Sequence, residues 1–231
     1  MDYEEVIARL KTYQNPTNVE GMGRFGINPA NTLGVSIPTL RTIAKEMGTN
    51  HQLAQQLWGS GIHEARILAS MTDDPEKVTT RQMEKWVRDF DSWDICDQCC
   101  SNLFDKTKWA HQKAVEWTSR KEEFVKRAGF VLMATLAVHD KKASNAQFQR
   151  YFSIIRREST DQRNFVKKAV NWALRQIGKR NQTLNRLAIE TARGIERRDS
   201  AAARWIAKDA IRELMSQSVR SKFLKKTKTT E

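Results

Sequence analysis

The stretches FVKRAGFVLMATLA at residues 124–137 and FVKKAVNWALRQIG at residues 165–178 decide the fold class. They align at an offset of 41 residues, beginning in both cases with Phe-Val-Lys, a basic residue and Ala. The segment ALRQI at 173–177 has a further echo in AIREL at 210–214. Each stretch is rich in strong helix formers, and another amphipathic segment precedes it. Two helices per roughly 40 residues predict a stack of helix pairs.

The remainder of the chain extends this pattern. All four prolines lie at or before Pro75, and runs of alternating β-branched residues are absent, so the sequence predicts an all-α protein. Residues 14–38, which are rich in Gly and Pro, are expected to form loop and short turns, followed by a helix from about Thr39. The prediction is a curved α-solenoid of HEAT-like two-helix repeats over 1–216 as a single domain, with a flexible basic tail at 217–231. An irregular helical bundle is the alternative.

Charge is distributed unevenly along the chain. The 231 residues carry 40 Lys and Arg against 27 Asp and Glu, a net charge of +13. Residues 1–104 hold 10 basic and 14 acidic side chains, whereas residues 105–231 hold 30 and 13. This asymmetry predicts a surface that meets a polyanion, with nucleic acid favoured over an acidic protein. A solvated basic surface without a partner is the plainer interpretation.

Several classes of protein are excluded by the sequence. No apolar run approaches the ~18 residues of a membrane helix, and the acidic, amphipathic start MDYEEVIARLK is unlike a signal peptide. Three cysteines are too few for a disulfide scaffold and suit a reducing compartment. The expectation is a cytoplasmic monomer without a membrane partner, associated with the nucleoid if the source is bacterial.

Helical spacing groups the candidate functional residues. Trp93 and Asp97 lie four apart, on one face of a helix expected over 93–104. A second helix carries a continuous stripe of Lys168, Trp172, Arg175 and Lys179. Arg127 takes the position of Lys168 in the preceding repeat and is expected to face the same concave surface; a structural ion pair with Asp97 is its alternative. The other tryptophans are expected in the core: Trp58, Trp86, Trp109, Trp117 and Trp205.

Metal and cofactor signals are weak. Cys96, Cys99 and Cys100 form a CxxCC pattern without the second half of a zinc site, so reduced thiols packed between helices are expected. The histidines share no ligand or triad spacing, and no phosphate-binding glycine loop is present. The sequence predicts neither a metal nor a cofactor.

The chain resembles the DNA alkylation repair family, the AlkD-like DNA glycosylases built from HEAT-like repeats. The similarity is carried, in family order and over nearly the whole chain except the tail, by QNPTNVEGMGRFGI at 14–27, LGVSIPTLRTIAKE at 33–46, SWDICDQ at 92–98, FVKRAGF at 124–130 and FVKKAVNWALRQIGK at 165–179.

The resemblance implies a role for individual residues. By position, Asp97 is similar to the family's catalytic aspartate, Trp93 and Trp172 to its two active-site tryptophans, and Arg127 to its arginine. Ser36 stands where some members have glutamine near the DNA, and Phe25 where some have tyrosine. These two differences bear on the range of substrates rather than on the chemistry.

The function that follows is a monofunctional DNA glycosylase that removes cationic N3- and N7-alkylated purines from duplex DNA. Asp97 would stabilise the oxocarbenium-like transition state and orient water, while Arg127, Lys168, Arg175, Lys179 and Ser36 would contact DNA. Two alternatives stay open: a non-catalytic HEAT-type module that binds DNA or RNA, and a protein-interaction scaffold. An acidic residue amid a polyanion-binding surface counts against the first of these.

Overall fold

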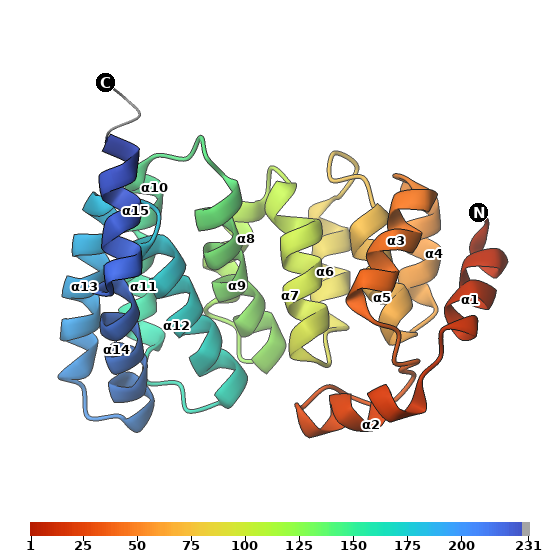
Figure 1. The fold of residues 1–231 in the computed structure, drawn as a ribbon, viewed down its shortest axis with the longest axis horizontal. Coiled ribbons are helices and arrows are strands. Elements are labelled where there is room, and N and C mark those ends of the chain that lie inside the picture. Colours follow the sequence, from red (N-terminus) through yellow and green to blue (C-terminus); the bar gives the residue numbers. More distant parts are fainter. Residues whose placement is uncertain (228–231) are drawn as a thin grey trace. The chain divides into compact units, whose positions relative to one another are not determined.

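A computed structural model describes residues 1–227, which form two compact units, Met1–Trp109 and the part of the chain from Ala110 onward. Helices and connecting turns account for all regular structure in the described residues, with no strand among them. The all-α prediction is confirmed. Each unit is described by itself below (Figure 1).

The first unit consists of seven α-helices and one 3-10 turn, and its core is aromatic. Trp58 and Trp86 stack in parallel with ring centroids 4.0 Å apart, and Phe104 packs against Trp86 at 6.3 Å. The Trp58 Nε1–H donates to Asp89 Oδ2 at 2.9 Å, which satisfies the one polar atom of that buried indole. The elements are α1 (Tyr3–Thr12), α2 (Pro16–Arg24), α3 (Ile37–Met47), α4 (His51–Gly59), α5 (His63–Thr72), α6 (Thr80–Arg88), α7 (Trp93–Asn102) and η1 (Phe104–Lys106).

Helix α2 corrects the expectation that residues 14–38 contain only loop and turns. Asn15 caps the helix by accepting from the Asn18 N–H, and Pro16 occupies the first turn, where its missing N–H costs nothing. The two internal glycines, Gly21 and Gly23, lower the helix propensity of this segment but do not end the helix. The next helix begins close to where the sequence predicts it, with Ser36 as N-cap of α3.

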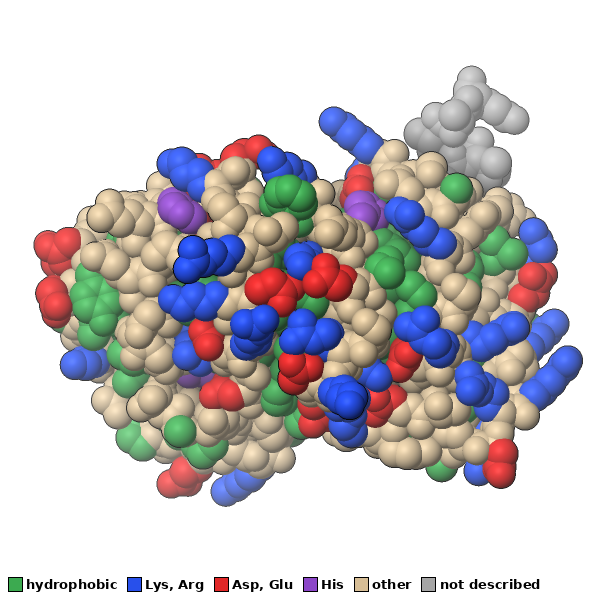
Figure 2. Space-filling view, turned by 180° about the vertical axis from the view of Figure 1, so that it is seen from behind, with side chains coloured by type: hydrophobic (Ala, Val, Ile, Leu, Met, Phe, Trp, Pro, Cys, Tyr) green, Lys and Arg blue, Asp and Glu red, His purple; other side chains and the backbone are tan. Residues whose placement is uncertain are grey.

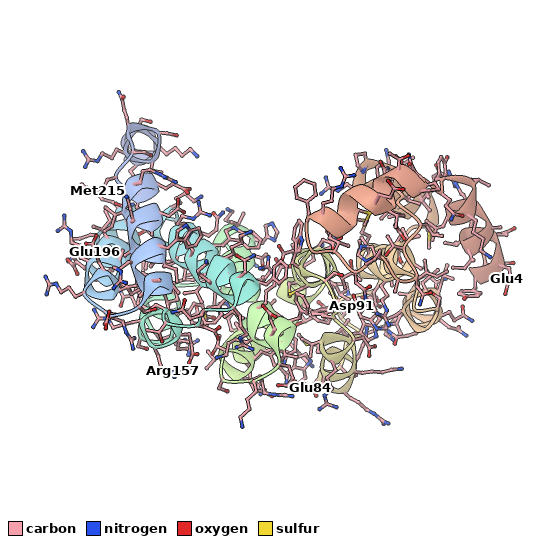
Figure 3. The ribbon with its side chains drawn as sticks, turned by 90° about the horizontal axis from the view of Figure 1, so that it is seen from below. Glu4, Glu84, Asp91, Arg157, Glu196 and Met215 are labelled. Atoms are coloured by element: carbon pink, nitrogen blue, oxygen red, sulfur yellow. The ribbon has the colours of Figure 1, made fainter. Side chains whose placement is uncertain are left out.

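The second unit contains α8 (Ala110–Trp117), α9 (Glu123–His139), α10 (Asn145–Gln149), α11 (Tyr151–Glu158), α12 (Asn164–Gly178), α13 (Gln182–Glu196), α14 (Ala201–Leu214) and α15 (Gln217–Thr227). Seen from below, helices α9, α12 and α14 lie in one layer and α8, α11 and α13 in the other (Figure 3). The predicted repeat is visible in the packing, because Phe124 and Phe165, which align in the sequence, touch with centroids 5.5 Å apart. The HEAT-like repeat prediction is confirmed.

Contacts between consecutive repeats follow a regular register. Asn171 Nδ2 donates to Asp209 Oδ2 at 2.7 Å, and Arg175 pairs with Glu213. Lys167 lies over the Trp205 ring, 5.0 Å from its centroid. Each pair joins α12 to the residue 38 positions later on α14. This register aligns the solvent-facing side chains of the two helices.

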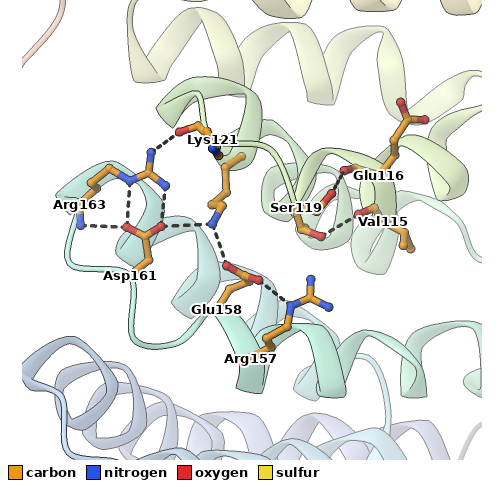
Figure 4. A network of polar contacts seen from close by, with 10 residues as sticks. Val115, Glu116, Ser119, Lys121, Arg157, Glu158, Asp161 and Arg163 are labelled. Atoms are coloured by element: carbon orange, nitrogen blue, oxygen red, sulfur yellow. Dashed lines mark hydrogen bonds and ion pairs between the residues drawn. The ribbon is translucent and has the colours of Figure 1, made fainter.

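A charge network joins two repeats where α9 begins and α12 follows α11. The Lys126 ammonium lies 2.7 Å from Glu158 and 3.5 Å from Asp161 (Figure 4). Arg163 grips Asp161 through Nε at 3.0 Å and Nη2 at 2.6 Å, and its Nη1 reaches the Lys121 carbonyl at 2.6 Å. The pKa values of Glu158 and Asp161 lie below their ordinary range: burial opposes the shift, but the hydrogen bonds and charges of their basic partners outweigh it. These carboxylates stay ionised as linkers between repeats.

The tryptophan predictions divide according to burial. Trp58, Trp86 and Trp117 are buried, as expected, and Trp109 is half-buried. Trp205 is 41% exposed, so the core assignment for this residue is wrong. Its neighbours Ala203, Ile206 and Ala207 already face the core, and the helical rotation turns position 205 outward.

The C-terminal segment is structured for most of its length. Helix α15 covers residues 217–227 of the stretch expected to be a flexible tail, and residues 228–231 lie outside the described part of the chain. The single repeat domain over 1–216 stays a prediction. No helix within residues 1–227 is long and apolar enough to span a membrane.

Candidate functional site

Helix α7 carries the two candidate residues of the first unit. Trp93 is its first residue and Asp97 follows one turn later, so both side chains project from one face, and both are half-buried. The Trp93 Nε1–H donates to the Phe25 carbonyl at 3.1 Å, which fixes the orientation of the indole. The predicted pairing of a carboxylate with an indole on one helix face is therefore present.

Phe25, at the C-cap of α2, extends this group. Its carbonyl holds Trp93, while 75% of the residue is exposed, the largest value among the exposed large hydrophobic side chains. An aromatic ring this exposed has little to do with the core. The sequence places Phe25 near the site only through the resemblance, because α2 was expected to be loop.

The loop after Phe25 is held by a buried carboxylate. Glu64, which is fully buried on α5, accepts the backbone N–H groups of Leu33 at 2.8 Å, Gly34 at 2.6 Å and Val35 at 3.2 Å. Three N–H donors compensate the cost of burying one carboxylate. Sequence reasoning missed Glu64, because nothing in its local sequence distinguishes it from a solvent-exposed glutamate.

The same loop is also fastened to the start of α7. The Asn28 N–H donates to Ser92 Oγ at 2.9 Å, and Asn28 Nδ2 donates to Asp91 Oδ2 at 2.9 Å. Ser92 is fully buried and serves as N-cap of α7, and Asp91 lies just before it (Figure 3). Hydrogen bonds therefore hold the loop from Phe25 to Ser36 against the N-terminal end of α7, the helix that carries Trp93 and Asp97.

A buried histidine–carboxylate pair joins α5 to α7. His63 Nε2 and Asp94 Oδ2 are 2.8 Å apart, and Asp94 Oδ1 has no hydrogen-bond partner among the described residues. Burial is the largest single influence and lowers the pKa of His63, but the hydrogen bond and charge of Asp94, with the charges of Glu64 and Asp91, raise that pKa above its ordinary value of 6.5. The folded protein therefore favours the imidazolium.

This pair predicts a pH dependence of stability. Because the folded pKa of His63 is raised, the stabilisation is fully present below the unfolded value and is lost as pH rises through the folded pKa. The free energy of unfolding, measured in urea between about pH 5.5 and 8.5, should fall across that window, and His63→Gln should remove this component. An equal decline in wild type and variant would contradict the assignment.

The three cysteines are packing residues. Cys96, Cys99 and Cys100 are buried free thiols, and burial raises the pKa values of Cys99 and Cys100 well above the ordinary range. Burial is the largest cause of the raised pKa of Cys100, followed by Cys96 and Cys99, and the charge of Asp97 adds a smaller contribution. Within residues 1–227, no three His, Cys, Asp or Glu side chains are grouped to hold a metal ion.

Arg127 differs from the position expected of it. It was predicted to face the same concave surface as Lys168, but only 5% of the residue is exposed, whereas Lys168 is exposed. Its Nη1 donates to the Phe165 carbonyl at 2.6 Å, joining α9 to the start of α12. Arg127 is buried because α9 packs against α12, a contact between residues about 40 positions apart. A contact between Arg127 and DNA stays a prediction.

The stripe on α12 is present as a surface feature. Lys168 is exposed, and Trp172, Arg175 and Lys179 are half-exposed along the same helix. Two of its cations are already paired: Glu213 on α14 binds both Arg175 and Lys179, and Asp209 lies 3.6 Å from Arg175. The free positive charge of the stripe is therefore smaller than the sequence implies.

These pairs predict that removing Glu213 strengthens DNA binding. Glu213→Gln should release Arg175 and Lys179 for phosphates, so that duplex affinity rises by roughly two- to tenfold and the slope of log affinity against log salt steepens by about 1. Fluorescence anisotropy at several salt concentrations measures both. Glu190→Gln, which removes an exposed carboxylate paired with Arg186 on α13, is the matched control. Equal effects of the two variants would show that only net charge matters.

The basic side chains of the second unit extend beyond the stripe. Lys141, Lys179, Arg180 and Lys222 line a hollow at the C-terminal end of α12. Further Lys and Arg side chains appear on the face seen from behind, where Asp and Glu are interspersed with them (Figure 2). Charge alone therefore does not single out one binding surface.

The structure distributes the predicted residues between the two units. Trp93, Asp97 and Ser36 belong to the first, where Ser36 is exposed and caps α3 by accepting from the Thr39 N–H at 3.4 Å. The second contains Arg127, Lys168, Trp172, Arg175 and Lys179. Within each unit the predicted helix faces are present, and the functional roles of these residues stay predictions.

Comparison with known proteins agrees with this architecture. The model of a family described as DNA alkylation repair enzyme matches residues 6–214. A relative from Listeria innocua, Uncharacterized protein Lin0241, is 23% identical over 197 residues, which cover 84% of this chain and 86% of the relative. A solved structure described as "a new family of proteins related to the HEAT-like repeat DNA glycosylases with affinity for branched DNA structures" has a TM-score of 0.77 at 19% identity, covering 92% of this chain and 95% of the other. At that identity the likeness concerns the fold. With the family match spanning nearly all its repeats, the chain belongs to the DNA alkylation repair enzyme family.

Proposed function

We propose that this protein is a monofunctional DNA glycosylase that hydrolyses the N-glycosidic bond of purines alkylated at N3 or N7 in duplex DNA. The observation that carries the proposal is the face of α7, where the half-buried Asp97 carboxylate lies one turn from an indole fixed by the Phe25 carbonyl. A carboxylate on a surface that meets DNA repels phosphate, so its presence there requires another task. Stabilising a developing cation is such a task.

The chemistry needs only one carboxylate. A purine alkylated at N3 or N7 is positively charged, so the bond between its nitrogen and the sugar C1′ breaks with the electron pair moving onto the ring, and the base leaves neutral without protonation. The sugar becomes oxocarbenium-like, and Asp97 stabilises this charge. Water oxygen then bonds to C1′, its proton passing through Asp97 to solvent, and an abasic site remains.

The aromatic residues suit a cationic substrate. The ring faces of Trp93 and Trp172 attract positive charge, and each contributes about 0.5–2 kcal/mol depending on how far the contact excludes water. Phe25, being largely exposed beside Trp93, would contact the damaged strand. Basic residues of the α12 stripe would hold the flanking phosphates without reading sequence.

A second candidate is binding to branched DNA without excision. The solved structure with the same fold is described as having affinity for branched DNA structures, and the second unit here is strongly basic. In that case Trp172, Lys168 and Arg175 would serve as stacking and backbone contacts, and Asp97 would be structural.

One assay separates the two candidates. The protein is incubated with randomly methylated duplex DNA, and free 7-methylguanine and 3-methyladenine are quantified by chromatography. Glycosylase function predicts release of both bases, and much slower release of neutral hypoxanthine from matched duplexes, because a neutral base is a poorer leaving group. Binding of a four-way junction with no base release from any substrate would favour the second candidate.

A further inference from the structure

Trp205, on α14, has a setting unlike that of the other tryptophans. The residue is 41% exposed, whereas the remaining six are buried or half-buried. An indole with this much of its surface in water keeps an apolar ring face available and is suited to contact a partner. Neither the candidate site nor the proposed chemistry uses it.

One basic side chain contacts this indole, and two more are exposed on the same two helices. The Lys167 ammonium lies 5.0 Å from the centroid of the Trp205 ring, a cation–π contact that positions the side chain. Lys168 on α12 and Lys208, one turn beyond Trp205, are exposed and have no ion pair among the described residues. The acidic neighbours are occupied: Asp199 lies 3.3 Å from Arg204, and Asp209 is bound by Arg212. An exposed ring among available cations therefore results.

The partner that fits this surface combines negative charge with a flat aromatic face. An unpaired nucleotide has both, since its base can stack on the indole while its phosphates meet the lysines. A base inside a duplex is already stacked on its neighbours and offers only its edges. An acidic peptide would satisfy the lysines and leave the ring face unused.

We propose that Trp205, with Lys167, Lys168 and Lys208, forms a stacking platform for an unpaired base in a single-stranded segment of bound DNA. This inference rests on the proposed DNA-binding function and adds a preference for substrates with unpaired nucleotides. The register of α12 against α14, seen also in the Asn171–Asp209 contact, holds Lys167 against the ring.

The test compares two labelled DNAs of equal duplex length, one blunt and one with a single-stranded overhang, by anisotropy. Trp205→Ala should weaken binding of the overhang DNA by about fivefold or more, the loss expected for one base–aromatic stack, and change binding of the blunt duplex by less than about twofold. Trp205→Phe should restore most of the overhang affinity, because a ring is retained. Val115→Ala, at an equally exposed apolar position (38%) on α8, should leave both unchanged.

The other outcomes are informative in different ways. Equal losses on both DNAs, or no loss on either, would overturn the stacking platform. A competition with poly-glutamate is a further check. If poly-glutamate displaces the overhang DNA from wild type but not from Trp205→Ala, the surface docks protein and the platform is also overturned. Release of methylated bases from blunt duplex is measured in parallel with Trp205→Ala. If wild type releases no base, the glycosylase proposal fails; if the variant releases bases normally without an overhang effect, only the platform fails.

Discussion

Asp97→Asn is expected to abolish release of 7-methylguanine from methylated duplex DNA while leaving DNA binding intact or stronger. The substitution keeps the size and shape of the side chain but removes the charge that would stabilise the oxocarbenium-like sugar. Losing one preorganised electrostatic contact typically lowers turnover by about 100- to 1000-fold. If this face meets DNA as proposed, removing a negative charge from it also reduces repulsion of phosphate.

Single-turnover excision and anisotropy on the same preparations measure both effects. Asp74→Asn is the matched control, because Asp74 is a carboxylate of the same unit whose ion pair is with Lys77 on the surface. A thermal melt confirms that Asp97→Asn is folded, which matters because Asp97 is half-buried on α7. Excision by Asp97→Asn at the wild-type rate would remove Asp97 from the mechanism.

Gly34→Ala is expected to produce the largest loss of stability in the first unit. Gly34 has a φ of +79°, and a Cβ there would lie 2.2 Å from the Asn15 carbonyl oxygen and 3.1 Å from Val19 Cγ2. The left-handed backbone costs an Ala about 1–2 kcal/mol, and the overlap with backbone adds roughly 1–3 kcal/mol. Because the Gly34 N–H donates to Glu64, a shift of the backbone at this position should also weaken the hydrogen bonds that hold the loop from Phe25 to Ser36.

Urea unfolding of wild type, Gly34→Ala and Gly48→Ala measures the effect. Gly48 is the control, with a φ of +68°, a ψ of −165° and no atom within 4 Å of its added Cβ, so Gly48→Ala carries a backbone cost without an overlap. A larger loss in Gly34→Ala than in Gly48→Ala is expected because only the Ala at position 34 overlaps with Asn15. Comparable losses in both would show that the loop rearranges freely around position 34.

Local sequence was sufficient for part of the candidate site. The four-residue spacing of Trp93 and Asp97 and the stripe on α12 are properties of a helix, because side chains three and four apart share a face whatever surrounds them. Helix α2 was missed because glycine and proline content outweighed the Asn15 cap and the favourable place of Pro16. The stability of a short capped helix depends on small favourable and unfavourable contributions from its cap and its helix propensities, and amino-acid composition alone does not show which of them is larger.

The sequence by itself determined that the chain is helical, that its helices pair in a repeat, and that positive charge is concentrated after residue 104. Tertiary structure decided which side chains are available: Arg127 is buried under α12, Glu213 neutralises Arg175 and Lys179, and Trp205 faces solvent. Helix formation depends on neighbours a few residues away. Exposure and ion pairing depend on residues about 38 positions along the chain, which only the packing of one repeat on the next brings into contact.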